Sequence, residues 1–459
     1  MFRRIRTAFF IVLSNALRIF VFFSLKVRIL DFRAVFAVNL VDKSRHFSYY
    51  EYKVNTCVNL FKDAHGSDSR RMRRFIMAEM YSEKIGDLGI ICMPGCESFV
   101  EKVENYLKAW HGEADQSYVV NSVISRFASG EAKGLIKESV RGKDLYIITD
   151  CFNYNVTYKM YQMTVPMSPD DHYADLKRII ASIEGKARRL TVIMPMLYEG
   201  RQHKRSGRES LDCALMLQEL VGMGVSNILT FDAHDSRINN AIPLSGFDNV
   251  RPAYQMIKAL IRAVPDVQID KDHMVIISPD EGAMSRCMYY SSVLGLDIGM
   301  FYKRRNYSVV VNGRNPIEAH EYLGQDLHGK DVIVVDDMIA SGESMLDVCK
   351  QLKDKGANRV FCFATFGLFT EGFDKFDQSA KEGVFDRVFT TNLIYRRPEL
   401  ATKPWFVEVN MCKYVAYLID TLNNDATIST LLNPVKRIQN LMDKHRKDLA
   451  AQMKIEFEE

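Results

Sequence analysis

Residues 332–346 read VIVVDDMIASGESML, and this stretch decides the fold. Its first four residues are β-branched and apolar, which predicts a strand buried on both faces. Asp336 and Asp337 close the strand, small residues form a short loop, and we expect a helix to begin near Ser344. A buried strand that passes through a short loop into a helix is the repeating unit of α/β folds with a parallel sheet.

The same alternation extends on both sides of this stretch, from about Gly86 onward. Short apolar runs typical of buried strands occupy residues 144–149, 189–196, 226–233, 273–278 and 359–367. Runs of helical length occupy residues 173–185, 210–224, 254–264 and 344–356. The last three of these runs have apolar residues at three- and four-residue spacing. The pattern predicts mainly parallel sheets flanked by helices, in two α/β domains that divide near Pro252 or Pro265.

The composition is that of a globular protein. Of the 459 residues, 47% are hydrophobic and 26% are charged, and the net charge is only +4. Such a balance argues against nucleic acid as a partner, because binding it needs a clustered excess of positive charge. The nine cysteines are scattered, and Cys92 and Cys96 have no second pair to complete a zinc site. We therefore expect reduced thiols and a cytoplasmic location.

Residues 1–76 differ from the rest of the chain. Arg3, Arg4 and Arg6 precede apolar stretches that Asn15 and Arg18 interrupt, so the apolar run is shorter than a membrane-spanning helix needs. One interpretation is a signal peptide or a basic surface anchor. The other is that this extension is not part of the natural enzyme and that translation begins at Met77. A membrane partner is expected only if the extension is genuine.

Polar clusters follow four of the predicted strands, at residues 232–235, 278–282, 303–305 and 336–344. Ligands of open α/β sheets bind at the carboxyl ends of strands, so these clusters are the candidate sites. In the last cluster, small residues let backbone amides approach an anion, and the helix N-terminus adds unpaired donors. Asp336 and Asp337 suit sugar hydroxyls, which need acceptors. From these residues alone, a plain strand-to-helix turn capped by Ser344 remains an alternative.

The 332–346 segment resembles the phosphoribosyl-pyrophosphate-binding loop of type I phosphoribosyltransferases, with Ser341 and Ser344 in place of two threonines. Further segments resemble, in the same order, those of ribose-phosphate pyrophosphokinases (phosphoribosyl pyrophosphate synthetases). They are RFASGEAKGLIKESVRGKDLYII, MPMLYEGRQHKRSGRESLDCAL, FDAHDSRINNAIP, ISPDEGAMSR and FYKRRNY. With DATISTLL near the end, the resemblance covers about residues 86–432. It implies two phosphoribosyltransferase-like domains, which we place at 77–252 (ATP side) and 253–432 (ribose 5-phosphate side), followed by a charged helical tail at 433–459 that we expect to be solvated.

The resemblance implies roles for individual residues on the ATP side. Phe127, Ser129 and Glu131 match the loop that reaches the adenine from a neighbouring subunit, although the family has Asp where this chain has Ser129. Arg201 and Gln202 match a pair that contacts ATP, and His203 replaces the usual Asp beside them.

The resemblance also assigns metal, catalytic and sugar-phosphate residues. His234 and Asp280 match the positions that hold Mg²⁺, the expected cofactor. Lys303 and Arg305 match the catalytic lysine and arginine at the base of a flexible loop. The ribose 5-phosphate contacts fall on Asp336, Asp337, Ala340, Ser341, Gly342, Glu343 and Ser344. Ala340 stands where familiar synthetases have Asp, and Glu343 is tolerable near a phosphate only if it points away.

The activity that the resemblance implies is transfer of pyrophosphate from magnesium-ATP to the 1-hydroxyl of ribose 5-phosphate, in a homo-oligomer that is commonly a hexamer. A phosphoribosyltransferase is one alternative, which the Arg-Gln and Lys-Arg-Arg segments disfavour. A non-catalytic regulatory paralogue is another. We expect such a paralogue to have lost Lys303, Arg305 or His234, all of which are present here.

Overall fold

The computed structural model describes residues 84–305 and 317–458, except for the side chains of residues 303–305, 317–320 and 452–458. Both interpretations of the first 76 residues concern a segment outside this range. Within the described range, no helix combines the length and the apolar character needed to cross a membrane.

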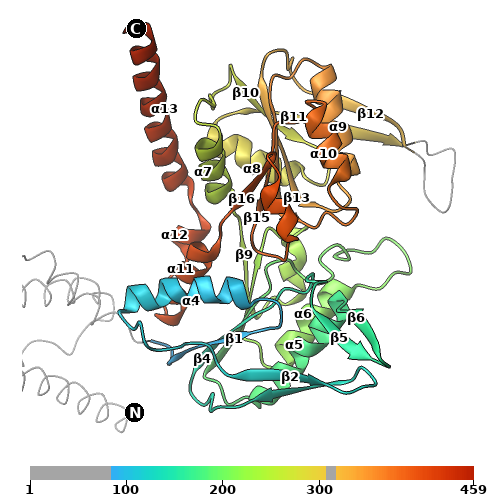
Figure 1. Ribbon diagram of the computed structural model, residues 1–459, viewed down its shortest axis with the longest axis vertical. Coiled ribbons are helices and arrows are strands. Elements are labelled where there is room, and N and C mark those ends of the chain that lie inside the picture. Colours follow the sequence, from blue (N-terminus) through green and yellow to red (C-terminus); the bar gives the residue numbers. More distant parts are fainter. Residues whose placement is uncertain (1–83, 306–316, 459) are drawn as a thin grey trace, which may run out of the picture. The chain divides into compact units, whose positions relative to one another are not determined.

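The first half of the described chain builds a five-stranded sheet in which all strands are parallel (Figure 1). Its strands, in spatial order, are β1 (Leu88–Cys92), β4 (Asp144–Ile148), β7 (Arg189–Ile193), β8 (Asn227–Phe231) and β9 (Gly246–Val250). The central strands are buried along nearly their whole length, as their continuous apolar runs predict.

The second half builds a seven-stranded sheet that is parallel except for one antiparallel strand at its edge. The order is β12 (Ile317–Leu323), β11 (Asp297–Arg305), β10 (Met274–Ser278), β13 (Asp331–Ile339), β14 (Val360–Gly367), β15 (Arg387–Thr391) and β16 (Phe406–Val409). Edge strand β12 pairs antiparallel with β11. The prediction of two mainly parallel sheets flanked by helices is confirmed.

Residues that alternate along the strands face different helix layers. Ile90 and Ile276 point to one side of their sheets, where helices complete a shared hydrophobic core. Their neighbours Ile91 and Ile277 point to the opposite side. The first layer contains α4 (Glu97–His111), α7 (Ala253–Ala263), α8 (Met284–Leu294) and α11 (Cys412–Asn423). The second contains α5 (Pro169–Ile183) and α6 (Asp212–Gly222) on the first sheet, and α9 (Glu343–Asp354) and α10 (Asp374–Lys381) on the second.

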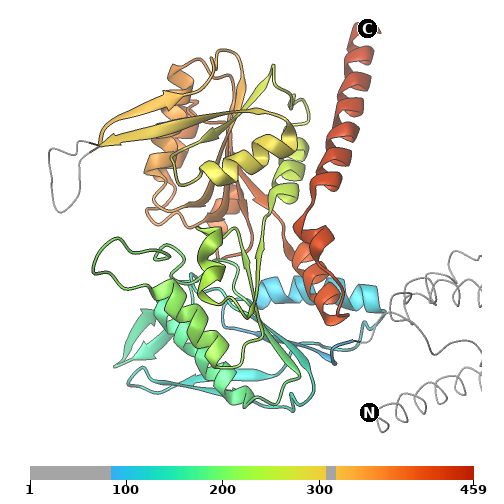
Figure 2. The ribbon, with the colours of Figure 1, turned by 180° about the vertical axis from the view of Figure 1, so that it is seen from behind.

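Helix α11 connects the two halves of the chain. It follows the last strand of the second sheet, yet it packs against α4 of the first half, which both ribbon views show (Figures 1 and 2). Asn423 at its end accepts a hydrogen bond from Ile85 N at 2.9 Å through its carbonyl, and its Nδ2 donates to buried Asp144 at 3.0 Å. Such a long-range contact leaves no periodic signal in the sequence, so the sequence did not predict it.

Two antiparallel hairpins lie outside the main sheets. One is formed by β2 (Ser122–Arg126) and β3 (Ala132–Ile136), the other by β5 (Thr157–Met160) and β6 (Met163–Pro166). Their tips are joined, because Tyr161 N donates to Ala128 O at 2.9 Å. Tyr161 and Gln162 form the second turn at positive φ, 46° and 68°. This turn carries no glycine, which explains why turn chemistry did not predict it.

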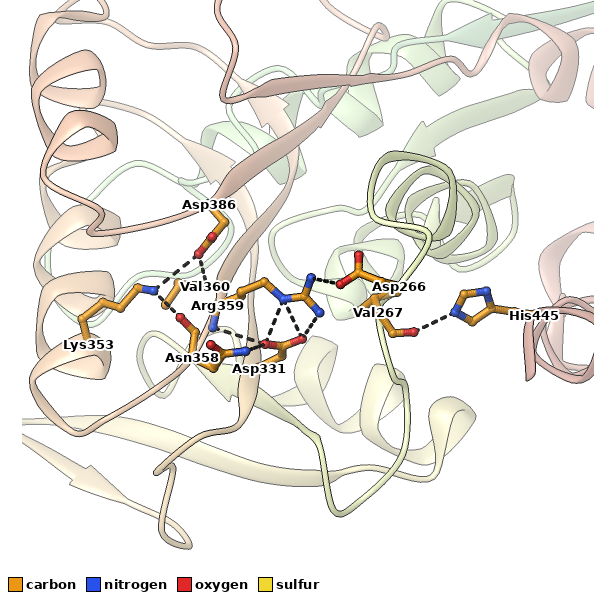
Figure 3. A network of polar contacts seen from close by, with 9 residues as sticks. All are labelled: Asp266, Val267, Asp331, Lys353, Asn358, Arg359, Val360, Asp386 and His445. Carbon is orange, nitrogen blue, oxygen red and sulfur yellow. Dashed lines mark hydrogen bonds and ion pairs between the residues drawn. The ribbon is translucent and has the colours of Figure 1, made fainter. Parts of the chain in front are cut away.

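The tail after Asn433 differs in part from the solvated helix expected for it. Helix α13 spans Val435–Glu458, but Ile438, Met442 and His445 are buried. His445 Nε2 is 2.7 Å from Val267 O, a contact drawn in Figure 3. The expectation is wrong for these turns, because the apolar positions recur at helical spacing and form a stripe that packs on α7 and α8. The remaining short elements are α12 (Ser429–Leu432) and two 3-10 turns, Ser236–Ala241 and Pro398–Thr402.

Asp150 joins the end of β4 to a loop of the second half. Its carboxylate accepts hydrogen bonds from Tyr395 N at 2.5 Å and from Phe152 N at 2.9 Å. Burial raises the pKa of Asp150 to about 6, although these two bonds oppose the shift. The ionised form of Asp150 therefore lowers the stability of the folded protein.

We expect this cost to appear as a pH dependence of stability. The pKa is higher in the folded state than in the unfolded state, so the folded state binds the extra proton between about pH 4 and 6, and stability falls as pH rises through that window. Relative to Asp150→Asn, the free energy of unfolding of the wild type should rise by up to about 3 kcal/mol when pH falls from 7 to 4. Urea unfolding of both proteins across this range measures the difference. A constant difference would contradict the assignment.

Candidate functional site

The carboxyl ends of β8, β10 and β13 carry the polar clusters that the sequence placed there. His234 follows β8, Asp280 follows β10, and Asp336 and Asp337 lie near the end of β13. His234 Nδ1 is 2.7 Å from Asp337 Oδ2, across 103 residues of sequence. The predicted ATP-side segment and the predicted sugar-side segment therefore meet directly.

This hydrogen bond fixes the protonation of its two partners. It raises the pKa of His234, although burial opposes the shift. Burial would raise the pKa of Asp337, but the bond from His234 and the charge of Arg286 lower it below its usual range. Burial and the adjacent charge of Asp337 raise the pKa of Asp336 well above its usual range. The acid pair thus contains one firmly ionised member, Asp337, beside one whose ionisation is disfavoured.

The loop after β13 has a shape that only glycine permits. The strand continues to Ile339, two residues beyond the predicted end at Asp337, and α9 begins at Glu343 with Gly342 as its N-cap. Gly342 has φ +87°, and an added Cβ would lie 2.3 Å from the Phe376 ring. The alternative of a turn capped by Ser344 is therefore wrong in its capping residue.

The remaining loop residues surround this glycine. Ala340 and Ser341 are half-buried, and Glu343 and Ser344 are exposed. The Glu343 carboxylate forms an ion pair with Lys375 of α10, which also binds Glu371. The charge of Glu343 is thus paired with a lysine of the neighbouring helix, and the backbone amides at the start of α9 are the candidate anion-binding groups.

Arg201, Gln202 and His203 lie in the loop between β7 and α6. Arg201 is exposed and lines a cavity of about 120 Å³ together with His234, Asp337 and the apolar side chains of Phe231 and Phe366. Gln202 Nε2 donates to Ser210 O at 2.9 Å, which folds the loop back on itself. His203 Nε2 lies 3.4 Å from Asp235 Oδ2, and its ring centroid is 5.3 Å from that of His234. Burial lowers the pKa of His203, so a neutral imidazole stands where the resemblance predicts an acid.

Phe127, Ser129 and Glu131 form the tip of the β2–β3 hairpin. Phe127 is 57% exposed, Ser129 Oγ donates to Glu131 at 2.9 Å, and the three do not line the cavity beside His234. Their predicted contact with adenine would need a neighbouring subunit, as the resemblance implies.

Lys303 and Arg305 lie among the last residues of strand β11. Lys303 pairs with His320 and Arg305 with Ile317 of β12, and a bulge lies between Arg304 and Arg305. The two strands form an arm at the edge of the second sheet. The side chains of both residues, and the loop at 306–316 whose base they are expected to form, are outside the described residues.

A magnesium ion at these strand ends would find one hard donor in the Asp280 carboxylate. His234 and Asp280 are the predicted ligands, and Asp337 occupies His234 Nδ1, which leaves Nε2 for a metal. Within residues 84–305 and 317–458, no three His, Cys, Asp or Glu side chains converge as a ready-made metal site. Magnesium takes most of its ligands from water and phosphate oxygens, so sparse protein ligation fits it.

Sequence reasoning missed a half-buried arginine beside the acid pair. Arg286 Nε donates to both carboxylate oxygens of Asp232 at 2.9 Å, and its Nη1 lies 3.9 Å from Asp336 Oδ1. Burial would lower the pKa of Arg286, but Asp232, Asp337 and Asp336 together raise it above its usual range. A signal existed, because Arg286 is the only charged residue of α8, MSRCMYYSSVL.

Comparison with known proteins matches two family models to this chain. The N-terminal domain of ribose phosphate pyrophosphokinase matches residues 88–224, and the phosphoribosyl transferase domain matches residues 247–392. A Vibrio cholerae protein named ribose-phosphate pyrophosphokinase is 29% identical over 327 residues, which cover 70% of this chain and 94% of that protein. Ribose-phosphate pyrophosphokinase A of Dictyostelium discoideum is 25% identical over 315 residues, 68% of this chain and 90% of its own length.

A solved structure shares the fold. The phosphoribosylpyrophosphate synthetase of Mycobacterium smegmatis superposes with a TM-score of 0.60 at 22% identity, over 74% of this chain and all of that one.

Proposed function

Since the chain belongs to the ribose-phosphate pyrophosphokinase family, we propose that it transfers pyrophosphate from magnesium-ATP to the 1-hydroxyl of ribose 5-phosphate. The products would be AMP and phosphoribosyl pyrophosphate, and the second would supply nucleotide biosynthesis. The observation that supports this most is the 2.7 Å contact between His234 and Asp337, because it brings the ATP-side segment against the sugar-side acid pair.

On the sugar side, each group of ribose 5-phosphate has a suitable partner. Asp336 and Asp337 would accept hydrogen bonds from the ribose hydroxyls. The loop of Ala340, Ser341, Gly342, Glu343 and Ser344 would hold the 5-phosphate at the start of α9.

On the donor side, Arg201, Gln202 and His203 would contact ATP, and Phe127, Ser129 and Glu131 of a neighbouring subunit would contact its adenine. His234 and Asp280 would hold magnesium, which when bound neutralises charge on the phosphate oxygens. Lys303 and Arg305 would stabilise the charge that develops on the transferred group.

The reaction then needs little covalent chemistry from the protein. The ribose 1-oxygen attacks the β-phosphorus and the 1-hydroxyl proton is released to solvent. A bond forms between the oxygen and the phosphorus, and the bond from the β-phosphorus to the oxygen that bridges it to the α-phosphate breaks, so that AMP leaves with that oxygen. Positioning and charge stabilisation account for most catalysis in such transfers. We further propose a homo-oligomer, because adenine contacts from a second subunit require one. We also propose a cytoplasmic location, because the described cysteines are free thiols.

A product assay tests the proposed function. With ATP, ribose 5-phosphate and magnesium, phosphorus NMR should show AMP and phosphoribosyl pyrophosphate rising in equal amounts, and neither should form when ribose 5-phosphate is omitted. Consumption of phosphoribosyl pyrophosphate with a nucleobase, but no synthesis from ATP, would favour a phosphoribosyltransferase instead. No turnover under any condition, with ribose 5-phosphate still bound, would favour a regulatory paralogue.

A further inference from the structure

Arg286 lies between carboxylates that come from both sheets. Its partner Asp232 directly follows β8 of the first sheet, whereas Asp336, 3.9 Å from its Nη1, belongs to β13 of the second. Arg286 itself is in the first turn of α8, which packs on β10, β11 and β13. One guanidinium therefore contacts the predicted ATP side and faces the predicted sugar side at once.

Asp232 is held in a conformation that needs such support. It has φ +43°, in the left-handed region that costs a non-glycine residue about 1 kcal/mol or more. Besides the two bonds from Arg286, it accepts one from Thr365 Oγ1 at 2.6 Å, and Thr365 O in turn accepts one from Thr391 Oγ1 at 2.6 Å. All these donors come from the second half of the chain.

The position of Asp232 determines where His234 lies. Only Ala233 separates them, and His234 then contacts Asp337. The segment is thus fixed at two points on the second half, by Arg286 and Thr365 at Asp232 and by Asp337 at His234. A displacement of Asp232 would therefore also displace His234 from Asp337.

We propose that Arg286 is a positioning residue for the transfer reaction, one that sets the His234 segment and the Asp336–Asp337 pair in register. This inference rests on the proposed function and adds a residue to it. Arg286 acts through geometry, because its planar fork lets one nitrogen serve Asp232 while another faces Asp336, which a lysine cannot reproduce.

The decisive variant is Arg286→Lys, which keeps the charge and removes the fork. We expect its kcat to fall about 100-fold, as a displacement of about 1 Å at a reacting centre does. Ribose 5-phosphate alone should bind about tenfold more weakly by calorimetry, the effect of losing one charge-assisted hydrogen bond.

The chain offers a matched control in Arg359, another arginine that clamps an aspartate of β13 (Figure 3). Its Nε and Nη2 donate to Asp331 at 2.7–3.1 Å, and its Nη1 donates to Asp266 at 2.7 Å. Asp331 begins the strand, five residues and about 16 Å from Asp336. Arg359→Lys should lower the unfolding temperature and leave kcat and ribose 5-phosphate affinity at their wild-type values.

Two results would overturn the proposal: wild-type kcat and affinity in Arg286→Lys, or equal losses in Arg286→Lys and Arg359→Lys. If Arg286→Lys does not fold, Thr365→Val carries the test, because it removes one bond to Asp232 with little change of shape. It should raise the dissociation constant of ribose 5-phosphate about tenfold, and an unchanged constant would count against the proposal. The binding of ribose 5-phosphate is measured without turnover. An inactive wild type would therefore refute the proposed function, and the binding data would still decide the role of Arg286.

Discussion

A Lys303→Ala variant is expected to lose about 10²- to 10³-fold in kcat, the usual effect of removing one preorganised donor from a developing charge. Lys303 lies at the end of β11, on the arm beside β10, where its backbone pairs with His320. If its ammonium group acts on the transferring phosphates, its loss should affect the transition state far more than the bound substrate. Steady-state kinetics and ATP binding, measured on the same preparation, separate the two effects.

The control for this variant is Lys350→Ala, which removes an exposed lysine from the outer face of α9. It should keep wild-type kcat and ATP affinity. Small and equal losses of kcat and ATP affinity in Lys303→Ala would refute a catalytic role for Lys303.

Replacing Gly342 with alanine should lower kcat/KM for ribose 5-phosphate about 100-fold. The new Cβ would lie 2.3 Å from the Phe376 ring, on a residue with φ +87°. Relief of the clash must move either the ring or the loop, and the loop is the less packed of the two. Its amides would then leave the position where the 5-phosphate is expected, whereas ATP binding measured alone should stay unchanged.

Gly383→Ala separates backbone strain from loop displacement. Gly383 also has a positive φ, +71°, but nothing lies within 4 Å of the added Cβ. Alanine there should cost about 1 kcal/mol of stability and leave the kinetics alone. Wild-type kcat/KM in Gly342→Ala would contradict the assignment of this loop to the sugar phosphate.

The parts of the fold that the sequence predicted depend on local pattern. Runs such as Val332–Val335 are apolar at every position, which in an α/β chain occurs where helices cover both faces of a sheet. The candidate site was predictable for a related reason. Strand ends in parallel sheets lie at one edge, so His234 and Asp337 could be expected near each other although 103 residues separate them.

The parts that were missed depend on contacts between distant segments. Strand β13 runs on to Ile339 because Met338 and Ile339 pair with Phe366 and Gly367 of β14. The sequence around Asp336 contains no sign of that partner. The packing of α11 on α4 and the burial of His445 against Val267 are of the same kind.

Arg286 shows most clearly what a single sequence cannot predict. Its place in α8 was visible, but its function depends on Asp232 and Asp336, which arrive from different strands 54 and 50 residues away in sequence. A single sequence shows that a lone arginine stands in an uncharged helix, and only the fold shows which carboxylates it meets.

The most direct test of the central claim is the fate of labelled ATP. Wild-type protein is incubated with ribose 5-phosphate, magnesium and ATP that carries ³²P in either the α or the γ position. The account predicts that the γ label moves to the sugar product and that the α label is recovered in AMP. Recovery of the α label in ADP, with or without a labelled sugar, would mean that a single phosphoryl group is transferred or hydrolysed, and would contradict pyrophosphate transfer.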